Sequence, residues 1–331
     1  MKAIYLLNGK SYDLIYGQEE RAKLASVLDF VSQPLDAEKL LKLSGDAFSD
    51  VEVIVSGWGM PRLDAALLAR FPKLKLVLYG AGSIKGFATP EMWARGIRVV
   101  SAWAANAVPV AEFAFAEIIF SLKHGWRFAT EYKSGRGGIR KDVPPPGAYK
   151  STVGLISLGM IGKMIVEKLK QLELRVIAFD PYVSTTDGEA IGVEIMELSE
   201  VFRKADVVSC HTPWLKETEK MLRKEHFESM KSGATFINTA RGAVIDENGM
   251  IEALRSRPDI YAVLDVTYPE PPVAESPLYD LPNVILTPHI AGSMGSECQR
   301  MGNLVIEEFK RYLAGEKLRY EISQAMAEKL A

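Results

Sequence analysis

The chain has 331 residues, of which 48% are hydrophobic and 25% are charged, and its formal net charge is −2. This length favours two domains, and the composition is typical of a soluble globular protein with no electrostatic reason to bind nucleic acid. The two cysteines, Cys210 and Cys298, are far apart and lack metal-ligand spacing, so the sequence predicts no metal site and fits a reduced, cytoplasmic compartment.

The first hundred residues alternate between short apolar runs and segments with helical spacing. The predicted strands are residues 2–7, 51–56, 74–79 and 97–100. The predicted helices between them are residues 19–28, 36–43 and 62–71. Strands that alternate with helices predict a parallel sheet covered on both faces.

The most apolar segment, residues 99–122, is long enough to span a bilayer. Glu112 and Glu117 interrupt it, and a carboxylate is costly inside a membrane. Proline suits the first turn of a helix. We therefore expect the end of a strand, a loop, and a long buried helix that starts near Pro109, and we expect no membrane partner.

A second series of strands fills the middle of the chain. These six strands are residues 152–157, 175–180, 205–211, 234–238, 260–265 and 283–288. Residues 296–331 are mostly helical in pattern and follow the last strand. We expect this tail to return to the first domain, which would then be discontinuous in sequence.

Residues 153–162, VGLISLGMIG, lead from an apolar strand into closely spaced glycines and then a helical pattern. They match the dinucleotide fingerprint G-x-G-x-x-G except that Ser157 replaces the first glycine. Gly159 would let the backbone approach a diphosphate at a helix N-terminus, and Gly162 would let the helix lie close to the strand. Serine is expected to fit if its φ is negative, with its hydroxyl near an N–H group. The alternative is a strand–helix turn that binds no ligand.

An acidic residue, Asp180, ends the next predicted strand, 18 residues after Gly162. A carboxylate in this place binds the ribose hydroxyls of a dinucleotide. No arginine follows closely to accept a 2′-phosphate, so the sequence favours NAD over NADP.

Polar side chains follow three later strands: Arg241, then Asp265 and Glu270, then His289. Each of these residues alone could be a surface or structural residue. Ligands of doubly wound sheets bind beyond the carboxyl ends of the strands, however, and all four residues are expected to lie there. A histidine can donate a proton to a ketone oxygen, and a neighbouring carboxylate stabilises the imidazolium. A guanidinium can bind a carboxylate through two parallel hydrogen bonds. This set predicts the reduction of a 2-keto acid.

With these motifs, the sequence resembles the D-isomer-specific 2-hydroxyacid dehydrogenase family over almost its whole length. The resemblance is carried by NAVPVAEFAFAEIIF, TVGLISLGMIG, ADVVSCHTPWLKET, INTARGAVIDENGMIEAL, LDVTYPEPP and LTPHIAG, in this order. The spacing is specific, because Glu270 lies 29 residues after Arg241 and His289 lies 19 residues after Glu270.

The resemblance implies an α/β fold with two Rossmann-like, doubly wound domains. The discontinuous substrate domain would be residues 1–103 and 292–331, and the NAD-binding domain residues 104–291. It also implies reversible hydride transfer between NAD(H) and a small 2-keto or 2-hydroxy acid by a cytoplasmic homodimer, with the helix near Pro109 in the dimer contact.

The resemblance implies a role for each site residue. Arg241 would orient the substrate, His289 would be the acid–base, and Glu270 would be its partner. The cofactor contacts would be Ser157, Gly159, Met160, Ile161, Gly162, Asp180, His211, Thr212, Pro213, Thr239, Ala240, Asp265 and Gly292, with Asp265 near the nicotinamide carboxamide. The substrate carboxylate would meet backbone N–H groups around Ala81, Gly82 and Ser83.

One departure from the family pattern concerns the substrate. Phosphoglycerate-oxidising members usually carry an arginine where Trp58 follows Gly57 here, which puts a phosphorylated substrate in doubt and suggests a bulkier or less charged one. Two alternatives to a 2-keto acid reductase stay open. One is a phosphoglycerate dehydrogenase, and the other is an NAD(H)-sensing corepressor of the same fold.

Overall fold

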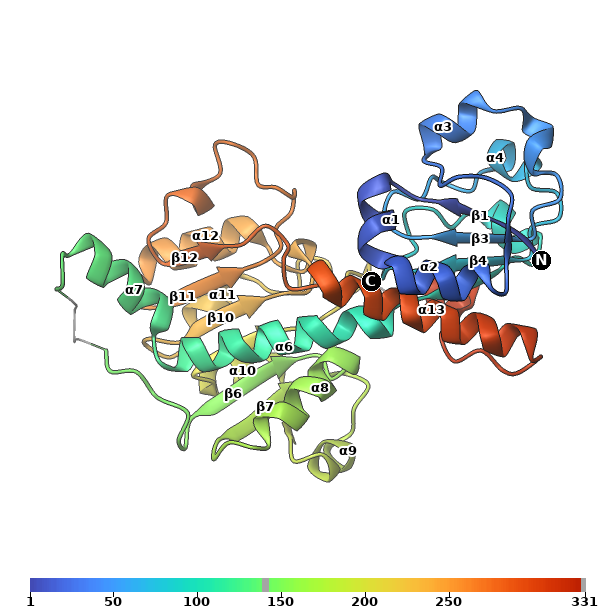
Figure 1. Ribbon diagram of the computed structural model, residues 1–331. Helices are drawn as coiled ribbons and strands as arrows, with labels where there is room; N and C mark the ends of the chain where they lie inside the picture. Colours follow the sequence, from blue (N-terminus) through green and yellow to red (C-terminus); the bar gives the residue numbers. More distant parts are fainter. Residues whose placement is uncertain (139–142, 329–331) are drawn as a thin grey trace. The chain divides into compact units, whose positions relative to one another are not determined.

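The computed structural model describes residues 1–138 and 143–328 (Figure 1). The chain divides into two units: Met1–Ala107 together with Ser293–Ala331, and Val108–Gly292. Each unit is built on its own sheet.

The first unit is a six-stranded sheet with helices on both faces. Its elements from the N-terminal segment are β1 (Lys2–Leu6), α1 (Gly9–Ile15), α2 (Gln18–Ala25), β2 (Asp29–Phe30), α3 (Ala37–Lys42), η1 (Gly45–Phe48), β3 (Val53–Ser56), α4 (Ala65–Ala69), β4 (Leu76–Tyr79), α5 (Pro90–Ala94) and β5 (Arg98–Ser101). Those from the C-terminal segment are η4 (Gly295–Glu297), α13 (Cys298–Leu313), β13 (Glu321–Ile322) and α14 (Gln324–Ala327). The strand order is β13-β5-β4-β3-β1-β2, and only β13 is antiparallel to its neighbour.

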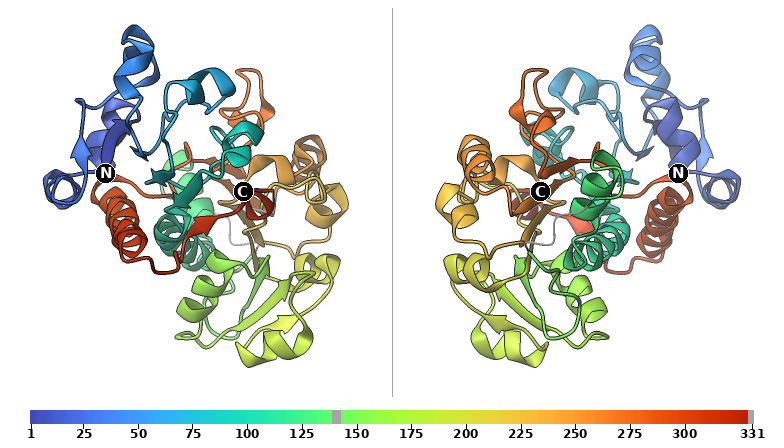
Figure 2. Two further views of the ribbon diagram at one scale, coloured as in Figure 1. Left: turned by 90° about the vertical axis from the view of Figure 1, so that its right-hand side faces the viewer. Right: turned by 90° about the vertical axis from the view of Figure 1, so that its left-hand side faces the viewer.

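Alternation along the strands explains the two layers of helices in this unit. Ile4 and Val77 face a core that α3, α4 and α5 complete, whereas Tyr5 and Leu78 face a core that α1, α2 and α13 complete. Figures 1 and 2 show α13 beside α1 and α2, although it comes nearly three hundred residues later in the chain. The C-terminal tail thus returns to the first unit, as expected from the sequence.

The long apolar helix, α6 (Trp103–Leu122), starts earlier than predicted. The N–H of Asn106 already donates to the carbonyl of Ala102 at 3.1 Å, so Pro109 lies inside the helix and the expected start near Pro109 is wrong. Alanine-rich residues 104–107 favour helix strongly enough to extend it toward β5. Among the described residues, α6 is the one helix long and apolar enough to cross a membrane, but more than half of that window is buried in the protein, as in a core helix.

The second unit is a seven-stranded parallel sheet. Its elements after α6 are α7 (Gly125–Ser134), β6 (Thr152–Ile156), α8 (Met160–Leu169), β7 (Arg175–Phe179), α9 (Thr185–Ala190), β8 (Glu194–Ile195), α10 (Leu198–Lys204), β9 (Val207–Cys210), α11 (Lys224–Glu228), β10 (Thr235–Asn238), η2 (Gly242–Val244), α12 (Glu247–Ser256), β11 (Tyr261–Leu264), η3 (Pro277–Tyr279) and β12 (Val284–Leu286). The strand order is β12-β11-β10-β9-β6-β7-β8. This order confirms the predicted doubly wound fold.

Helices also cover both faces of the second sheet. One face packs against α10, α11 and α12, and the other against α6 and α8. Gly154 in β6 permits the close approach of α10, because a Cβ there would lie 2.6 Å from a Val201 methyl group. The strand order reverses between β6 and β9, and ligands of such sheets bind at that point, beyond the carboxyl ends of the strands.

Candidate active site

The turn after β6 has the geometry of a dinucleotide fingerprint. A Cβ at Gly162 would lie 2.3 Å from the carbonyl oxygen of Ser157, so α8 packs against the turn too closely for any other residue. A Cβ at Gly159, in contrast, would meet only one described atom within 4 Å outside its chain neighbours, the Ser157 Oγ at 3.8 Å. The space above Gly159 at the N-terminus of α8 is therefore open, as a bound diphosphate requires.

Ser157 does not have the backbone conformation expected from the sequence. Its φ is +77°, in the left-handed region, so the expectation of a negative φ is wrong. The strand must turn sharply into α8, and the tight packing of Gly162 on the Ser157 carbonyl fixes that turn. The hydroxyl also has a different neighbour from the expected N–H group: Oγ lies 3.5 Å from Oδ2 of Asp180.

Asp180 is buried at the end of β7 and is held by backbone N–H groups. Its Oδ2 accepts from the N–H of Leu158 at 2.7 Å, and its Oδ1 accepts from the N–H of Tyr182 at 2.8 Å. The carboxylate is thereby fixed beside the glycine turn. Each oxygen has accepted one backbone hydrogen bond and retains acceptor capacity for a ribose hydroxyl.

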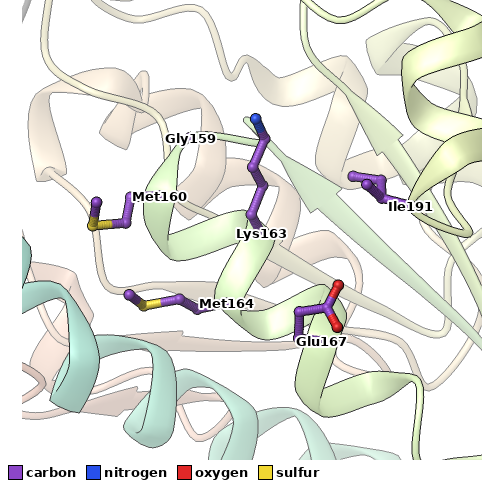
Figure 3. A pocket seen from close by; sticks show the side chains of 6 residues that line it. All are labelled: Gly159, Met160, Lys163, Met164, Glu167 and Ile191. Carbon is purple, nitrogen blue, oxygen red and sulfur yellow. The ribbon is translucent and has the colours of Figure 1, made fainter.

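A pocket of about 540 Å³ runs along α8 from Gly159 (Figure 3). Met160, Met164 and Ile191 give it an apolar lining, and Figure 3 shows Lys163 reaching toward the end of α8 that carries Gly159. An ammonium near a helix N-terminus adds positive charge where phosphates bind. Lys163 is not among the predicted site residues, although its position directly after the last fingerprint glycine could have indicated it.

Two buried polar atoms beyond β9 and β10 have no partner in the described part of the chain. They are the Thr239 hydroxyl and Nδ1 of His211, whose Nε2 lies 3.0 Å from the Ser209 hydroxyl. Buried polar groups are usually paired, so these two groups beside the turn after β6 can serve as hydrogen-bond partners for a ligand there. Together with the open space above Gly159, these atoms fit a dinucleotide at the predicted place.

Burial lowers the pKa of His211 to about 3. The unfolded chain binds a proton on this ring below about pH 6.5, whereas the folded chain does not until about pH 3. His211 therefore contributes nothing to the pH dependence above pH 6.5, and it lowers the free energy of unfolding by up to about 1.4 kcal/mol per unit as the pH falls from 6.5 toward 3. We expect urea unfolding at pH 7, 6 and 5 to show that the free energy of unfolding falls less with decreasing pH in His211→Gln than in the wild type. Equal slopes would contradict this role of burial.

His289 and Glu270 form a hydrogen-bonded pair. Nδ1 of His289 lies 2.6 Å from Oε1 of Glu270, and both side chains are substantially exposed, at 47% and 42%. The carboxylate binds Nδ1, which leaves Nε2 of the imidazole free to exchange a proton with a ligand. The backbone at His289 is left-handed, with φ +53°, a strained state typical of functional positions.

Asp265 holds the loop that carries His289. Its Oδ1 accepts from the Thr287 hydroxyl at 2.6 Å and the N–H of Ile290 at 2.8 Å, and its Oδ2 accepts from the N–H of Ala291 at 2.9 Å. Its own carbonyl accepts from the N–H of His289 at 2.9 Å. This buried carboxylate therefore positions the histidine, a role that the sequence analysis did not anticipate.

Arg241 follows β10 in a turn that the buried Asn238 closes. The Asn238 amide donates to the carbonyl of Arg241 and accepts from the N–H of Ala240, both at 3.0 Å. Burial lowers the pKa of the Arg241 guanidinium, while the nearby Glu270 carboxylate raises it, and the group stays charged at neutral pH. A Cβ at Gly242 would lie 2.0 Å from the Thr267 backbone, so this turn packs directly against the segment that leads to Glu270.

An aromatic contact joins the loop after β9 to the loop after β11. The rings of Trp214 and Tyr268 pack edge to face with centroids 5.1 Å apart, although both residues are partly exposed. Tyr268 lies two residues before Glu270, and Trp214 directly follows Pro213. No sequence pattern pairs these residues, because the contact depends on strands that are far apart in the chain.

The predicted substrate contacts belong to the first unit, at the carboxyl ends of its own strands. The carbonyl of Ala81 accepts from the N–H of Ala102, and the carbonyl of Gly82 accepts from the Ser101 hydroxyl at 2.5 Å. Within residues 1–138 and 143–328, no hydrogen bond uses the N–H groups of Ala81, Gly82 or Ser83 as donors. Those groups can donate hydrogen bonds to an anion, and their contact with a substrate carboxylate stays a prediction.

No group of three or more His, Cys, Asp or Glu residues is arranged to hold a metal ion in the part of the chain that the structure describes. The two cysteines there are both buried and free.

The geometry of the second unit agrees with a comparison to known families. The model of the D-isomer specific 2-hydroxyacid dehydrogenase, NAD binding domain, matches residues 115–291, which is more than half of the chain. The chain belongs to the D-isomer-specific 2-hydroxyacid dehydrogenase family. The match confirms the predicted family and the prediction that NAD(H) is the cofactor.

Relatives within this family carry several names. The chain is 31% identical over 262 residues to a D-3-phosphoglycerate dehydrogenase of Archaeoglobus fulgidus, covering 79% of this chain and 50% of that one. It is 28% identical over 309 residues to a hydroxypyruvate reductase of Thermotoga maritima, covering 93% and 96%. The chain spans about half the length of the phosphoglycerate dehydrogenases it matches.

Solved structures support the fold over the whole chain. A phosphoglycerate oxidoreductase from Rhizobium etli is 26% identical with a TM-score of 0.78, covering 98% of each chain. The predicted α/β fold with a discontinuous first domain is therefore confirmed. The roles of individual site residues remain predictions within this family fold.

Proposed function

We propose that this protein is an NAD(H)-dependent D-2-hydroxyacid dehydrogenase that interconverts a small 2-keto acid and its D-2-hydroxy acid. The observation that carries the proposal is the 2.6 Å contact between His289 and Glu270, in an NAD-binding domain of this family. A histidine with one ring nitrogen bound to a carboxylate and the other free is arranged for acid–base work.

The chain's own residues supply binding and the proton. NAD(H), when bound by Gly159, Asp180, Thr239 and their neighbours, supplies or accepts the hydride. In the reducing direction, Nε2–H of His289 gives its proton to the ketone oxygen, which becomes the new hydroxyl, and Glu270 stabilises the imidazolium before this transfer. Arg241 binds the substrate's carboxylate or carbonyl oxygen through its planar guanidinium.

The two units take different parts in this proposal. Residues 104–291 form the NAD-binding domain, and residues 1–103 and 292–331 form the substrate domain, whose N–H groups at Ala81, Gly82 and Ser83 bind the substrate carboxylate. We also propose a cytoplasmic location and a homodimer. The exposed apolar side chain of Phe120, on α6, supports the dimer.

The substrate class is tested by NADH oxidation with a panel of 2-keto acids. The panel is pyruvate, glyoxylate, hydroxypyruvate, phenylpyruvate, 2-oxoglutarate and phosphohydroxypyruvate. Because Trp58 supplies no cation after β3, we expect turnover with an unphosphorylated acid and little with the phosphorylated one. The product is expected to be the D isomer, measured by chiral chromatography.

The panel also separates the alternatives. Preferred turnover of phosphohydroxypyruvate would point to a phosphoglycerate dehydrogenase, the name that several relatives carry. Tight NADH binding with no turnover of any acid would contradict the enzyme and favour an NAD(H)-sensing protein.

A further inference from the structure

Ser157 keeps a side chain where the backbone favours glycine. Its φ of +77° is a conformation that costs an L-residue free energy and costs glycine almost none. The close packing of Gly162 on the Ser157 carbonyl prevents the turn from relaxing. A strained residue that persists at a ligand site points to a function of its side chain.

The Ser157 hydroxyl lies between two parts of the cofactor site. On one side, Oγ is 3.5 Å from Oδ2 of Asp180. On the other side, Oγ lies 3.8 Å from the place that a Cβ on Gly159 would occupy, and no other described atom outside the chain neighbours of Gly159 comes within 4 Å of it. The hydroxyl therefore borders both the ribose-binding carboxylate and the open space above the glycine turn.

The chemistry of the two groups is complementary. The Asp180 carboxylate is fixed by the N–H groups of Leu158 and Tyr182 and can only accept hydrogen bonds. The Ser157 hydroxyl can both donate and accept. A pair of neighbouring ribose hydroxyls needs acceptors for its protons and a donor for its oxygens, which the carboxylate and hydroxyl together supply.

We propose that Ser157 is a specificity-determining residue of the cofactor site, whose hydroxyl joins Asp180 in binding the ribose diol of NAD(H). This inference rests on the proposed function only in taking NAD(H) as the cofactor. A cofactor with a 2′-phosphate lacks the free diol and gains nothing from this hydroxyl, so Ser157 widens the preference for NADH over NADPH.

The test is equilibrium binding of NADH and NADPH, followed by fluorescence, to the wild type, Ser157→Ala and Ser157→Gly. Each variant is expected to raise the Kd for NADH about three- to tenfold, the effect of one hydrogen bond, and to change the Kd for NADPH less than about twofold. Ser157→Gly is expected to have a higher Tm than Ser157→Ala, because glycine relieves the left-handed strain. The control is Lys150→Gly, which relieves an exposed left-handed residue, at φ +58°, outside the cofactor site and is expected to leave both Kd values unchanged.

The outcomes separate this inference from the proposed function. NADH binding within twofold of the wild type in both Ser157 variants would overturn the inference while leaving the dehydrogenase intact. An equal loss of NADH and NADPH affinity would also overturn it, because the hydroxyl would then not recognise the diol. Failure of the wild type to bind NADH would overturn both, and normal NADH binding without keto-acid turnover would overturn the proposed activity alone.

Discussion

Replacing His289 by alanine is expected to lower kcat for 2-keto acid reduction by about 10²- to 10⁴-fold and to leave the Kd for NADH within about threefold. One ring nitrogen of the imidazole binds the Glu270 carboxylate and the other is free, as a proton donor to the substrate requires. Without it, water must supply the proton to the ketone oxygen. Because the diphosphate and ribose would bind at Gly159 and Asp180 instead, cofactor affinity has no reason to fall.

Steady-state kinetics and NADH titration on the same preparation measure both effects. A matched control is His226→Ala, which removes another imidazole of this unit, one that accepts a hydrogen bond from the N–H of Arg223 at the start of α11. This control is expected to keep wild-type kcat. If His289→Ala retained kcat within about tenfold, His289 would not be the proton donor.

The sheet, and the grouping of the proposed catalytic residues at its edge, could be predicted because both follow from local patterns. Apolar runs such as residues 152–156 and 261–264 can be buried only as strands between helices. Once the strands are parallel, polar residues directly after them must lie at one edge. For this reason the sequence alone predicts that Arg241, Glu270 and His289 form a group.

Features that depend on tertiary packing could not be predicted from the sequence. The conformation of Ser157 is fixed by a helix that packs on its carbonyl, not by serine's own preference. Proline is most common in the first turn of a helix, but in α6 the alanines before Pro109 form helix as well, so the helix starts earlier. The two-residue strands β2, β8 and β13 are edge pairings too short to leave a pattern.

The hydrogen bonds of Asp265 are another feature that could not be predicted from the sequence. The family resemblance places it near the nicotinamide, but in the structure both carboxylate oxygens bind the loop of residues 287–291. We therefore expect Asp265 to affect catalysis through the position of His289.

Asp265→Asn is expected to lower kcat about 10- to 100-fold and to reduce the free energy of unfolding by roughly 1–3 kcal/mol. The two carboxylate oxygens each accept from a backbone N–H, of Ile290 and of Ala291. An asparagine can replace only one of them with an oxygen, so its NH₂ group must face an N–H in either orientation. One buried donor then loses its partner, and the loop shifts to relieve the contact.

Two comparisons separate positioning from a general loss of stability. Asp280→Asn changes an exposed acid in the same unit and is expected to alter neither kcat nor unfolding. The double variant Asp265→Asn/His289→Ala is expected to have the same kcat as His289→Ala, because Asp265 has no other route to the reacting atoms. If the two losses in kcat multiplied, Asp265 would act on the reaction independently of His289, through the cofactor or the substrate.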